Sequence, residues 1–148
     1  MAESFAASVG RWASKTPERI AAVRGRAIDL LADEMALTVR DGGRVPFQTG
    51  NLARSILAST QGMPNTAEGP FSGSNVGLVT ATLGAMQPMW IGYTANYAKR
   101  QNFGFVGADS LGRVYNQAGA YFVENAIAKW PEFVKQAAKE LQTAVESR

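Results

Sequence analysis

The chain changes from helix to strand within a short stretch that reads Thr49-Gly50-Asn51-Leu52-Ala53-Arg54-Ser55-Ile56. A threonine hydroxyl at the start of such a stretch can accept hydrogen bonds from the first backbone amides of a helical turn. Leu52 and Ile56 are four residues apart, so on that turn both side chains point toward a core. We therefore predict a short helical turn capped by Thr49, which leads directly into a strand over residues 56–60.

A long helix is predicted before this stretch. Thr16, Pro17 and Glu18 are typical of a helix start, because they supply a capping hydroxyl, a proline at the first helical position and an acidic first turn. The apolar residues that follow recur at three- and four-residue intervals: Ile20, Val23, Ala27, Leu30, Leu31, Met35 and Leu37. The stretch Asp41-Gly42-Gly43 predicts the end of this helix near Arg40. Residues 1–15 are expected to be an extension or a separate short helix.

Strand-like and polar segments follow residue 56. Residues 76–83 and 89–93 are rich in β-branched or aromatic side chains and are interpreted as two further strands. Residues 61–75 are rich in Gly, Pro, Ser and Asn, which predicts a flexible arm. Residues 103–116 are interpreted as a second, glycine-containing excursion.

The C-terminal segment is predicted to be a helix that is broken once. Apolar spacing becomes helical from Gln117, and Pro131 interrupts it. Helices on both sides of strands, in a chain of 148 residues, predict one α+β domain over residues 1–148. We expect the N-terminal helix and the broken C-terminal helix to pack on a small, mainly antiparallel sheet with a long protruding loop.

The composition narrows the classes of function. The chain has no cysteine and no histidine, which excludes disulfides, Cys/His zinc sites, cysteine nucleophiles and histidine bases. Asp29 and Asp33 stand one helical turn apart, but without further oxygen ligands they are interpreted as the solvated face of a helix. We expect no enzyme activity, no cofactor and no metal site. No stretch is apolar enough for a transmembrane helix, so no membrane partner is expected.

Two more segments, taken with residues 49–56, resemble a known family. They read Ile91-Gly92-Tyr93-Thr94-Ala95-Asn96-Tyr97-Ala98 and Phe103-Gly104. Together with Phe122 and Ala126 near the C-terminus, they resemble the small neck and tail-completion proteins of tailed bacteriophages of the siphophage type. The resemblance covers residues 20–141.

Two positions depart from the pattern of that family. Gln101 and Asn102 stand where the family usually has a carboxylate before the aromatic-glycine pair. Gly119 and Ala120 replace an Arg-Pro pair before the last helix. These departures affect any interface ion pair or kink inferred from the resemblance.

The resemblance implies a structural virion protein that forms a ring, expected to be a hexamer, at the head–tail junction. The implied partners are other copies of the chain, the head connector and the tail-tube or tail-terminator proteins, with genome DNA passing non-specifically through the channel. Such a protein is made in the cytoplasm of the host bacterium and ends in the neck or tail of the virion.

Two groups of candidate residues follow. Interface residues in the arm and the following turn are expected to be Met63, Phe71, Tyr97, Arg100, Gln101 and Phe103. The structural motif consists of Thr49, Gly50, Leu52, Ser55 and Ile56.

A second function stays open. The net charge is +3, and residues 97–103 mix basic and aromatic side chains, as nucleic-acid stacking surfaces do. The alternative is therefore a small basic nucleic-acid-binding module, which would bind DNA as a monomer with a steep dependence on salt.

Overall fold

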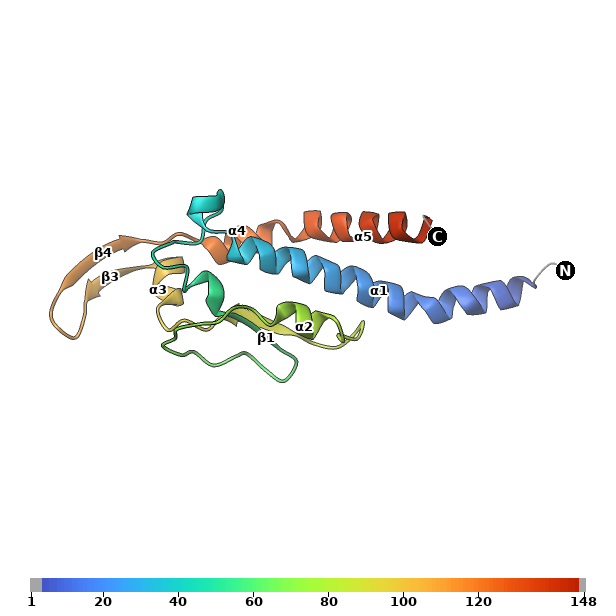
Figure 1. The fold of residues 1–148 in the computed structure, drawn as a ribbon, viewed down its shortest axis with the longest axis horizontal. Helices are drawn as coiled ribbons and strands as arrows, with labels where there is room; N and C mark the ends of the chain where they lie inside the picture. Colours follow the sequence, from blue (N-terminus) through green and yellow to red (C-terminus); the bar gives the residue numbers. More distant parts are fainter. Residues whose placement is uncertain (1–3, 147–148) are drawn as a thin grey trace.

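The protein has an α+β fold, as predicted, and the molecule is elongated (Figure 1). A computed structural model describes the backbone of residues 4–146 and the side chains of residues 15–144. Helix α1 (Phe5–Ala36) runs along most of the molecule, and helix α5 (Trp130–Glu146) lies beside it (Figure 1). At the opposite end from both termini, strands β3 (Gly104–Ala108) and β4 (Val114–Ala118) form a projecting hairpin.

Helix α1 continues through the predicted start. Pro17 lies inside it, so the prediction of a separate N-terminal helix or extension over residues 1–15 is wrong. A proline in a helix removes one backbone hydrogen bond, here the one to the carbonyl of Ala13. The residues before it include many good helix formers, and the helix tolerates that single loss.

The helix ends four residues before the predicted position near Arg40. Its last residue is Ala36, because the following backbone turns to pair with Val45: the Val45 amide donates to the Leu37 carbonyl at 3.2 Å. A 3₁₀ turn, η1 (Val39–Asp41), follows and ends at Gly42, which has a φ of 91°. A side chain at Gly43 would lie 2.0 Å from the Leu37 carbonyl oxygen, so only glycine permits this close approach.

The first sheet consists of two of the three predicted strands. Strand β1 (Ile56–Ser59) pairs with β2 (Trp90–Tyr93) in antiparallel register, with Ile56 opposite Tyr93. A second 3₁₀ turn, η2 (Ala53–Ser55), leads into β1, in agreement with the predicted change from turn to strand. The outer edge of β1 is covered by a side chain, since Asn75 both accepts from the Ala58 amide at 2.7 Å and donates to its carbonyl at 3.0 Å.

The predicted strand over residues 76–83 is wrong. This segment begins with helix α2 (Val76–Thr80), which packs against α1. Val76, Thr80 and Leu83 are the buried positions, at the four- and three-residue spacing of a helix. The Thr80 hydroxyl donates to the Asp29 carboxylate of α1 at 2.8 Å, so Asp29 has a structural partner.

The predicted excursion at residues 103–116 is the end of helix α3 (Ala98–Phe103) and most of the β3–β4 hairpin. The C-terminal helix is broken, as predicted, although at a slightly different place. Helix α4 (Phe122–Ala128) is separated from α5 by Lys129 alone, and Pro131 is the second residue of α5.

Asn102 joins the end of α3 to the start of α4. Its side-chain oxygen accepts from the Val123 amide at 3.0 Å, and its nitrogen donates to both oxygens of Glu124 at 3.0 and 2.9 Å. The Tyr121 amide donates to the Asn102 carbonyl at 2.9 Å, with Tyr121 in the left-handed region at a φ of 50°. Asn102 itself is only 3% exposed. Because its side chain accepts from a first-turn amide, Asn102 holds the start of α4 from a different part of the chain.

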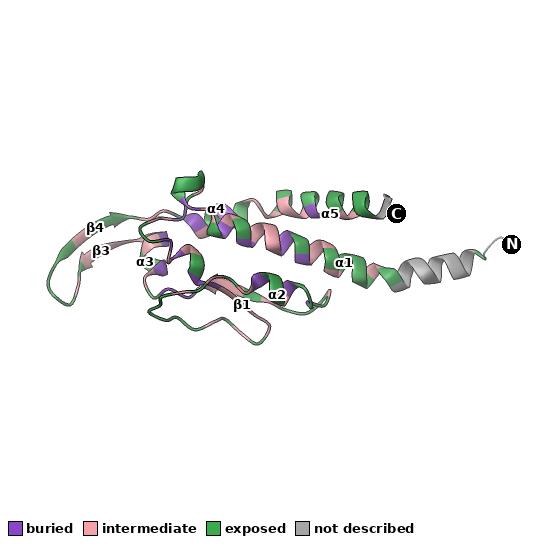
Figure 2. Ribbon diagram, in the orientation of Figure 1, coloured by how far each residue is buried: buried purple, intermediate pink, exposed green. Residues whose placement is uncertain are grey.

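The core has two neighbouring parts, with Tyr93 packed against both. The first lies between α1, β1 and α2, and its buried members are Ile28, Ala32, Met35, Ile56, Ala58, Val76, Leu83 and Ala126. The second lies under the turn that precedes β1, and its buried members are Val45, Leu52, Ala95, Ala98 and Phe122. Figure 2 shows these buried residues in the middle of the molecule and none in the β3–β4 hairpin.

Candidate functional site

The two longer segments that carry the family resemblance lie side by side. The Thr94 amide donates to the Ser55 carbonyl at 2.8 Å, and the Thr94 hydroxyl donates to the same oxygen at 2.7 Å. The Ser55 hydroxyl in turn donates to the Leu52 carbonyl at 2.7 Å. Ser55 and Thr94 are buried, so these hydrogen bonds join residues 49–56 and 91–98 in the interior of the molecule.

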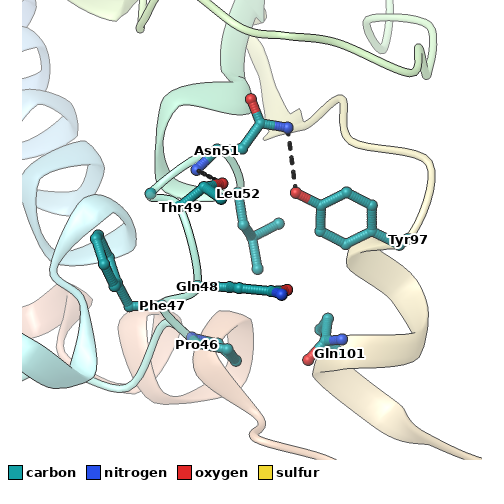
Figure 3. Close-up of a pocket in the computed structure, with 9 residues that line it drawn as sticks. Pro46, Phe47, Gln48, Thr49, Asn51, Leu52, Tyr97 and Gln101 are labelled. Carbon is teal, nitrogen blue, oxygen red and sulfur yellow. Dashed lines mark hydrogen bonds between the residues drawn. The ribbon is translucent and has the colours of Figure 1, made fainter.

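An open pocket of about 340 Å³ lies where these segments meet α3 (Figure 3). Asn51 and Tyr97 stand across from one another, and the Asn51 amide donates to the Tyr97 hydroxyl at 3.2 Å. Its lining consists of Pro46, Phe47, Gln48, Thr49, Gly50, Asn51, Leu52, Tyr97 and Gln101. Thus five of the candidate residues, Thr49, Gly50, Leu52, Tyr97 and Gln101, are brought together here.

The side chains that line this pocket are uncharged. Its lining offers amide, hydroxyl and backbone groups, but no carboxylate, amine or guanidinium. Such groups can hold a peptide backbone or a side-chain amide by hydrogen bonds. Within residues 15–144, no group of three or more acidic side chains is arranged to hold a metal ion. The described part of the chain also includes no helix long and apolar enough to cross a membrane.

The predicted cap at Thr49 is present in a weaker form. The Thr49 hydroxyl accepts from the Asn51 amide at 3.3 Å, but the 3₁₀ turn η2 begins at Ala53 and Thr49 is not its capping residue. Leu52 and Ile56 are both buried, as the four-residue spacing predicts.

We expect Thr49→Val to lower the free energy of unfolding by about 0.5–1 kcal/mol, because it removes this acceptor. Thr49→Ser retains the hydroxyl and should lose much less. Urea unfolding of the three proteins measures the difference. Equal, negligible losses would show that the hydroxyl does not support the turn.

The remaining candidate interface residues are distributed over the molecule. Arg100 stacks on the ring of Phe105 at 4.1 Å, and Phe103 makes an edge contact with Tyr121 at 6.4 Å. Met63 is 62% exposed and lies close to Gly92 of β2. None of these three lines the pocket.

The arm over residues 61–75 is attached to its own subunit at several points. The Ala67 amide donates to the Thr94 carbonyl at 2.7 Å, and the Asn96 amide donates to the Ala67 carbonyl at 3.1 Å. The Phe71 amide donates to the Asn51 side chain at 3.1 Å, and the Phe71 ring is packed against the second part of the core. Phe71 therefore has partners within its own chain, and its role at an interface stays a prediction.

The β3–β4 hairpin is the projecting element that sequence reasoning missed. A signal for it was present, because Phe105-Val106 and Val114-Tyr115 are strand formers on both sides of a polar turn. At the tip, Asp109 accepts from Arg113 at 2.6 Å and from Tyr115 at 3.3 Å. Desolvation alone would raise the pKa of Asp109, but the hydrogen bonds from Arg113, Leu111 and Tyr115 outweigh it and lower that pKa.

We expect stability to be nearly constant between about pH 5 and pH 8, because no histidine or cysteine titrates there. Hydrogen bonds lower the pKa of Glu140, as they do that of Asp109. The two ionised carboxylates therefore stabilise the folded state above about pH 4, and this stabilisation is lost as the pH falls further. Burial, with the nearby charge of Glu34, raises the pKa of Tyr93 and so favours its protonated form in the folded state. The folded state therefore loses stability as the pH rises above about pH 10, where the same tyrosine ionises in the unfolded chain.

Thermal unfolding measured from below about pH 4 to above about pH 10 tests these effects, and the absorbance of ionised tyrosine reports on Tyr93 at the alkaline end. A sharp transition between about pH 6 and pH 7 would contradict the expectation.

Comparison with known proteins adds no relative: no protein-family model, no curated protein and no solved structure matches the chain. The resemblance carried by residues 49–56 and 91–98 therefore stays a prediction.

Proposed function

We propose that the protein is a structural subunit of a tailed bacteriophage, which forms a ring at the head–tail junction through which DNA passes. The resemblance of residues 49–56, 91–98 and 103–104 supports this function, since the three segments lie around one pocket or next to it. The chemistry of that pocket suits contacts with another protein.

The observation that carries the proposal is the projecting β3–β4 hairpin. A two-stranded hairpin is marginally stable in water by itself, and neighbouring structure usually covers one of its faces. Here no residue from 104 to 118 is buried within the subunit. An element of this kind suits a subunit whose structure is completed by contacts in an assembly.

A ring of identical subunits needs two different contact surfaces on each subunit, because every interface joins one surface to the other. The elongated shape presents different surfaces at the hairpin and along α1 and α5 (Figure 1). In a virion the ring would contact the head connector on one side and the tail tube or the tail terminator on the other.

Deletion of the gene from the phage that encodes this chain tests the proposal. We expect filled heads and complete tails that remain separate in electron micrographs, and joined infectious particles when the wild-type chain is supplied. Joined, infectious particles in the absence of the chain would contradict the proposed function.

The alternative, a small nucleic-acid-binding module, is favoured by one observation. Arg40, Arg44, Arg54, Lys99 and Arg100 are exposed, and none forms a salt bridge within the described residues. Arg40 stacks on Phe47 of the pocket at 4.5 Å, and Arg54 lies against Gly50.

DNA binding separates the two functions. For a subunit that lines a channel we expect only weak, sequence-independent binding that vanishes near physiological salt, because a channel must not retain the passing duplex. Fluorescence anisotropy of a labelled duplex across a salt series measures this. Tight or sequence-specific binding by the monomer would favour the nucleic-acid module.

A further inference from the structure

The two faces of the β3–β4 hairpin differ in how completely they are covered. Opposite residues of an antiparallel pair share a face, so the register places Phe105, Gly107, Tyr115 and Gln117 on one side. On this closed face the rings of Phe105 and Tyr115 are 6.0 Å apart, and Arg100 covers Phe105. These contacts satisfy the closed face within the subunit.

The other face is apolar and uncovered. The same register places Val106, Ala108, Val114 and Ala118 there, with Asn116 as the polar member. Val106 is 76% exposed and Val114 is 82% exposed, and Leu111 at the tip is 75% exposed. We call Val106, Ala108, Leu111 and Val114 the open face.

The edges of the hairpin are also unprotected. Each strand pairs only with the other, so within residues 4–146 neither outer edge has a strand partner. Exposed edges usually carry a lysine, another charged residue or a proline, which prevents pairing with a second chain. Strands β3 and β4 contain none of these. The open face and the free edges are therefore the features of a binding element.

The same chain offers an apolar groove of about 370 Å³ between α1 and the start of α5. Its lining consists of Arg19, Ile20, Val23, Arg24, Trp130 and Val134. An apolar cavity of about 150 Å³ can hold a benzene molecule, so the groove has room for Leu111 together with a valine of the open face.

Charge and shape indicate a second copy of the chain as the partner. The open face has no charge, and the surface lining the groove is apolar. Arg19 at the rim is exposed and forms no salt bridge among the described side chains, so it can donate to the free carbonyls of a hairpin edge. The hairpin lies at the end of the molecule opposite both termini (Figure 1), whereas the groove is lined by residues 19–24 of α1 and the first turns of α5, so the hairpin does not fill the groove of its own subunit.

We infer that the open face of the β3–β4 hairpin docks in the α1–α5 groove of a second copy. The contact joins two different surfaces, so it propagates from copy to copy and can close into a ring. This inference rests on the proposed function and names the surfaces through which the ring forms.

Cysteine cross-linking tests the contact directly, because the natural chain has no cysteine. One variant combines Leu111→Cys with Val134→Cys, and its matched control combines Leu111→Cys with Gln136→Cys, on an exposed position of α5. After mild oxidation of the purified oligomer, we expect a ladder of disulfide-linked multimers from the first variant. From the control we expect at most dimers. No ladder, or equal ladders, would overturn the inference.

Charge on the open face provides an independent measurement. Val106→Asp should leave the melting temperature of the monomer unchanged, since Val106 is exposed, and should raise the dissociation constant of the oligomer at least about tenfold. Val39→Asp makes the same substitution at an exposed valine outside the proposed contact and should change that constant less than about twofold. Equal effects of the two substitutions would overturn the inference.

The outcomes also separate the inference from the proposed function. If the wild-type chain forms rings but the variant with Leu111→Cys and Val134→Cys gives no cross-linked ladder, the proposed contact is wrong and the ring itself still stands. A wild-type chain that stays monomeric at all concentrations would overturn the contact, while the effect of the gene deletion on head–tail joining still decides the virion function.

Discussion

Asn102→Asp is expected to lower the free energy of unfolding by about 3–5 kcal/mol at neutral pH. Asn102 is almost fully buried, and its amide nitrogen donates to both oxygens of the Glu124 carboxylate. An aspartate there would lose these donors and would place a buried negative charge beside the exposed carboxylate of Glu124. Its oxygen could still accept from the Val123 amide, so repulsion and desolvation cause most of the loss.

Urea unfolding at two pH values measures this effect. The loss should become smaller below about pH 4, where a protonated carboxyl group can again donate a hydrogen bond. Asn102→Ala should cost about 2 kcal/mol without the pH dependence, because it removes the hydrogen bonds to the Val123 amide and the Glu124 carboxylate but adds no charge. Asn116→Asp makes the same change at an exposed hairpin position and should cost less than about 0.5 kcal/mol. An Asn102→Asp protein as stable as the wild type would show that Asn102 does not hold the start of α4.

Gly119→Ala is the second substitution with a large expected effect. A Cβ atom at Gly119 would lie 2.4 Å from the Asn102 carbonyl oxygen and 2.6 Å from the Phe103 carbonyl carbon. Both neighbours are backbone atoms, so the base of the hairpin must shift to admit the methyl group. We expect a loss of about 3 kcal/mol.

Hydrogen exchange locates the effect. The Ala120 and Tyr121 amides donate to the carbonyls of Gln101 and Asn102, so their protection should fall in the Gly119→Ala protein. Gly77→Ala is the matched control, because a methyl group there meets no atom within 4 Å. It lies inside helix α2, where alanine is the better helix former, so stability should stay equal or increase. Unchanged protection at Ala120 and Tyr121 would contradict the close packing at Gly119.

The same contacts give a physical reason for asparagine at position 102 and glycine at position 119. A carboxylate at position 102 would repel Glu124, whereas asparagine both donates to Glu124 and accepts from Val123. Gly119 fits against the backbone of Asn102, where a larger residue would collide. Asn102 and Gly119 meet at one crossing of the chain.

Much of the fold could be predicted from local patterns in the sequence. The N-terminal helix, the strands β1 and β2 and the break before α5 follow from apolar spacing and from turn residues. The apolar stripe predicted on α1 is only partly the buried one: Ala27 and Met35 are buried, whereas Ile20 is 49% exposed. Residues 76–83 were misinterpreted because Val76, Val79 and Thr80 are strand formers by composition, while contact with α1 selects the helix. Pro17 favoured a helix start, but helix formers on both sides carry α1 through it.

The candidate site was predicted in part. Thr49, Gly50 and Leu52 meet Tyr97 and Gln101 at one pocket, although more than forty residues separate the two groups in the sequence. The role of the arm could not be judged, because its attachment through Ala67 and Phe71 depends on partners far away in the chain. The open face of the hairpin depends on the register of β3 and β4, which only the structure defines.

The mass of the native protein in solution, alone and mixed with purified tail tubes, tests the ring most directly. We predict a closed species whose mass is a whole multiple of the 15.8 kDa subunit, present alone or formed with the tubes and bound to them. The contradicting result is a chain that remains a monomer in both samples and does not bind to the tubes.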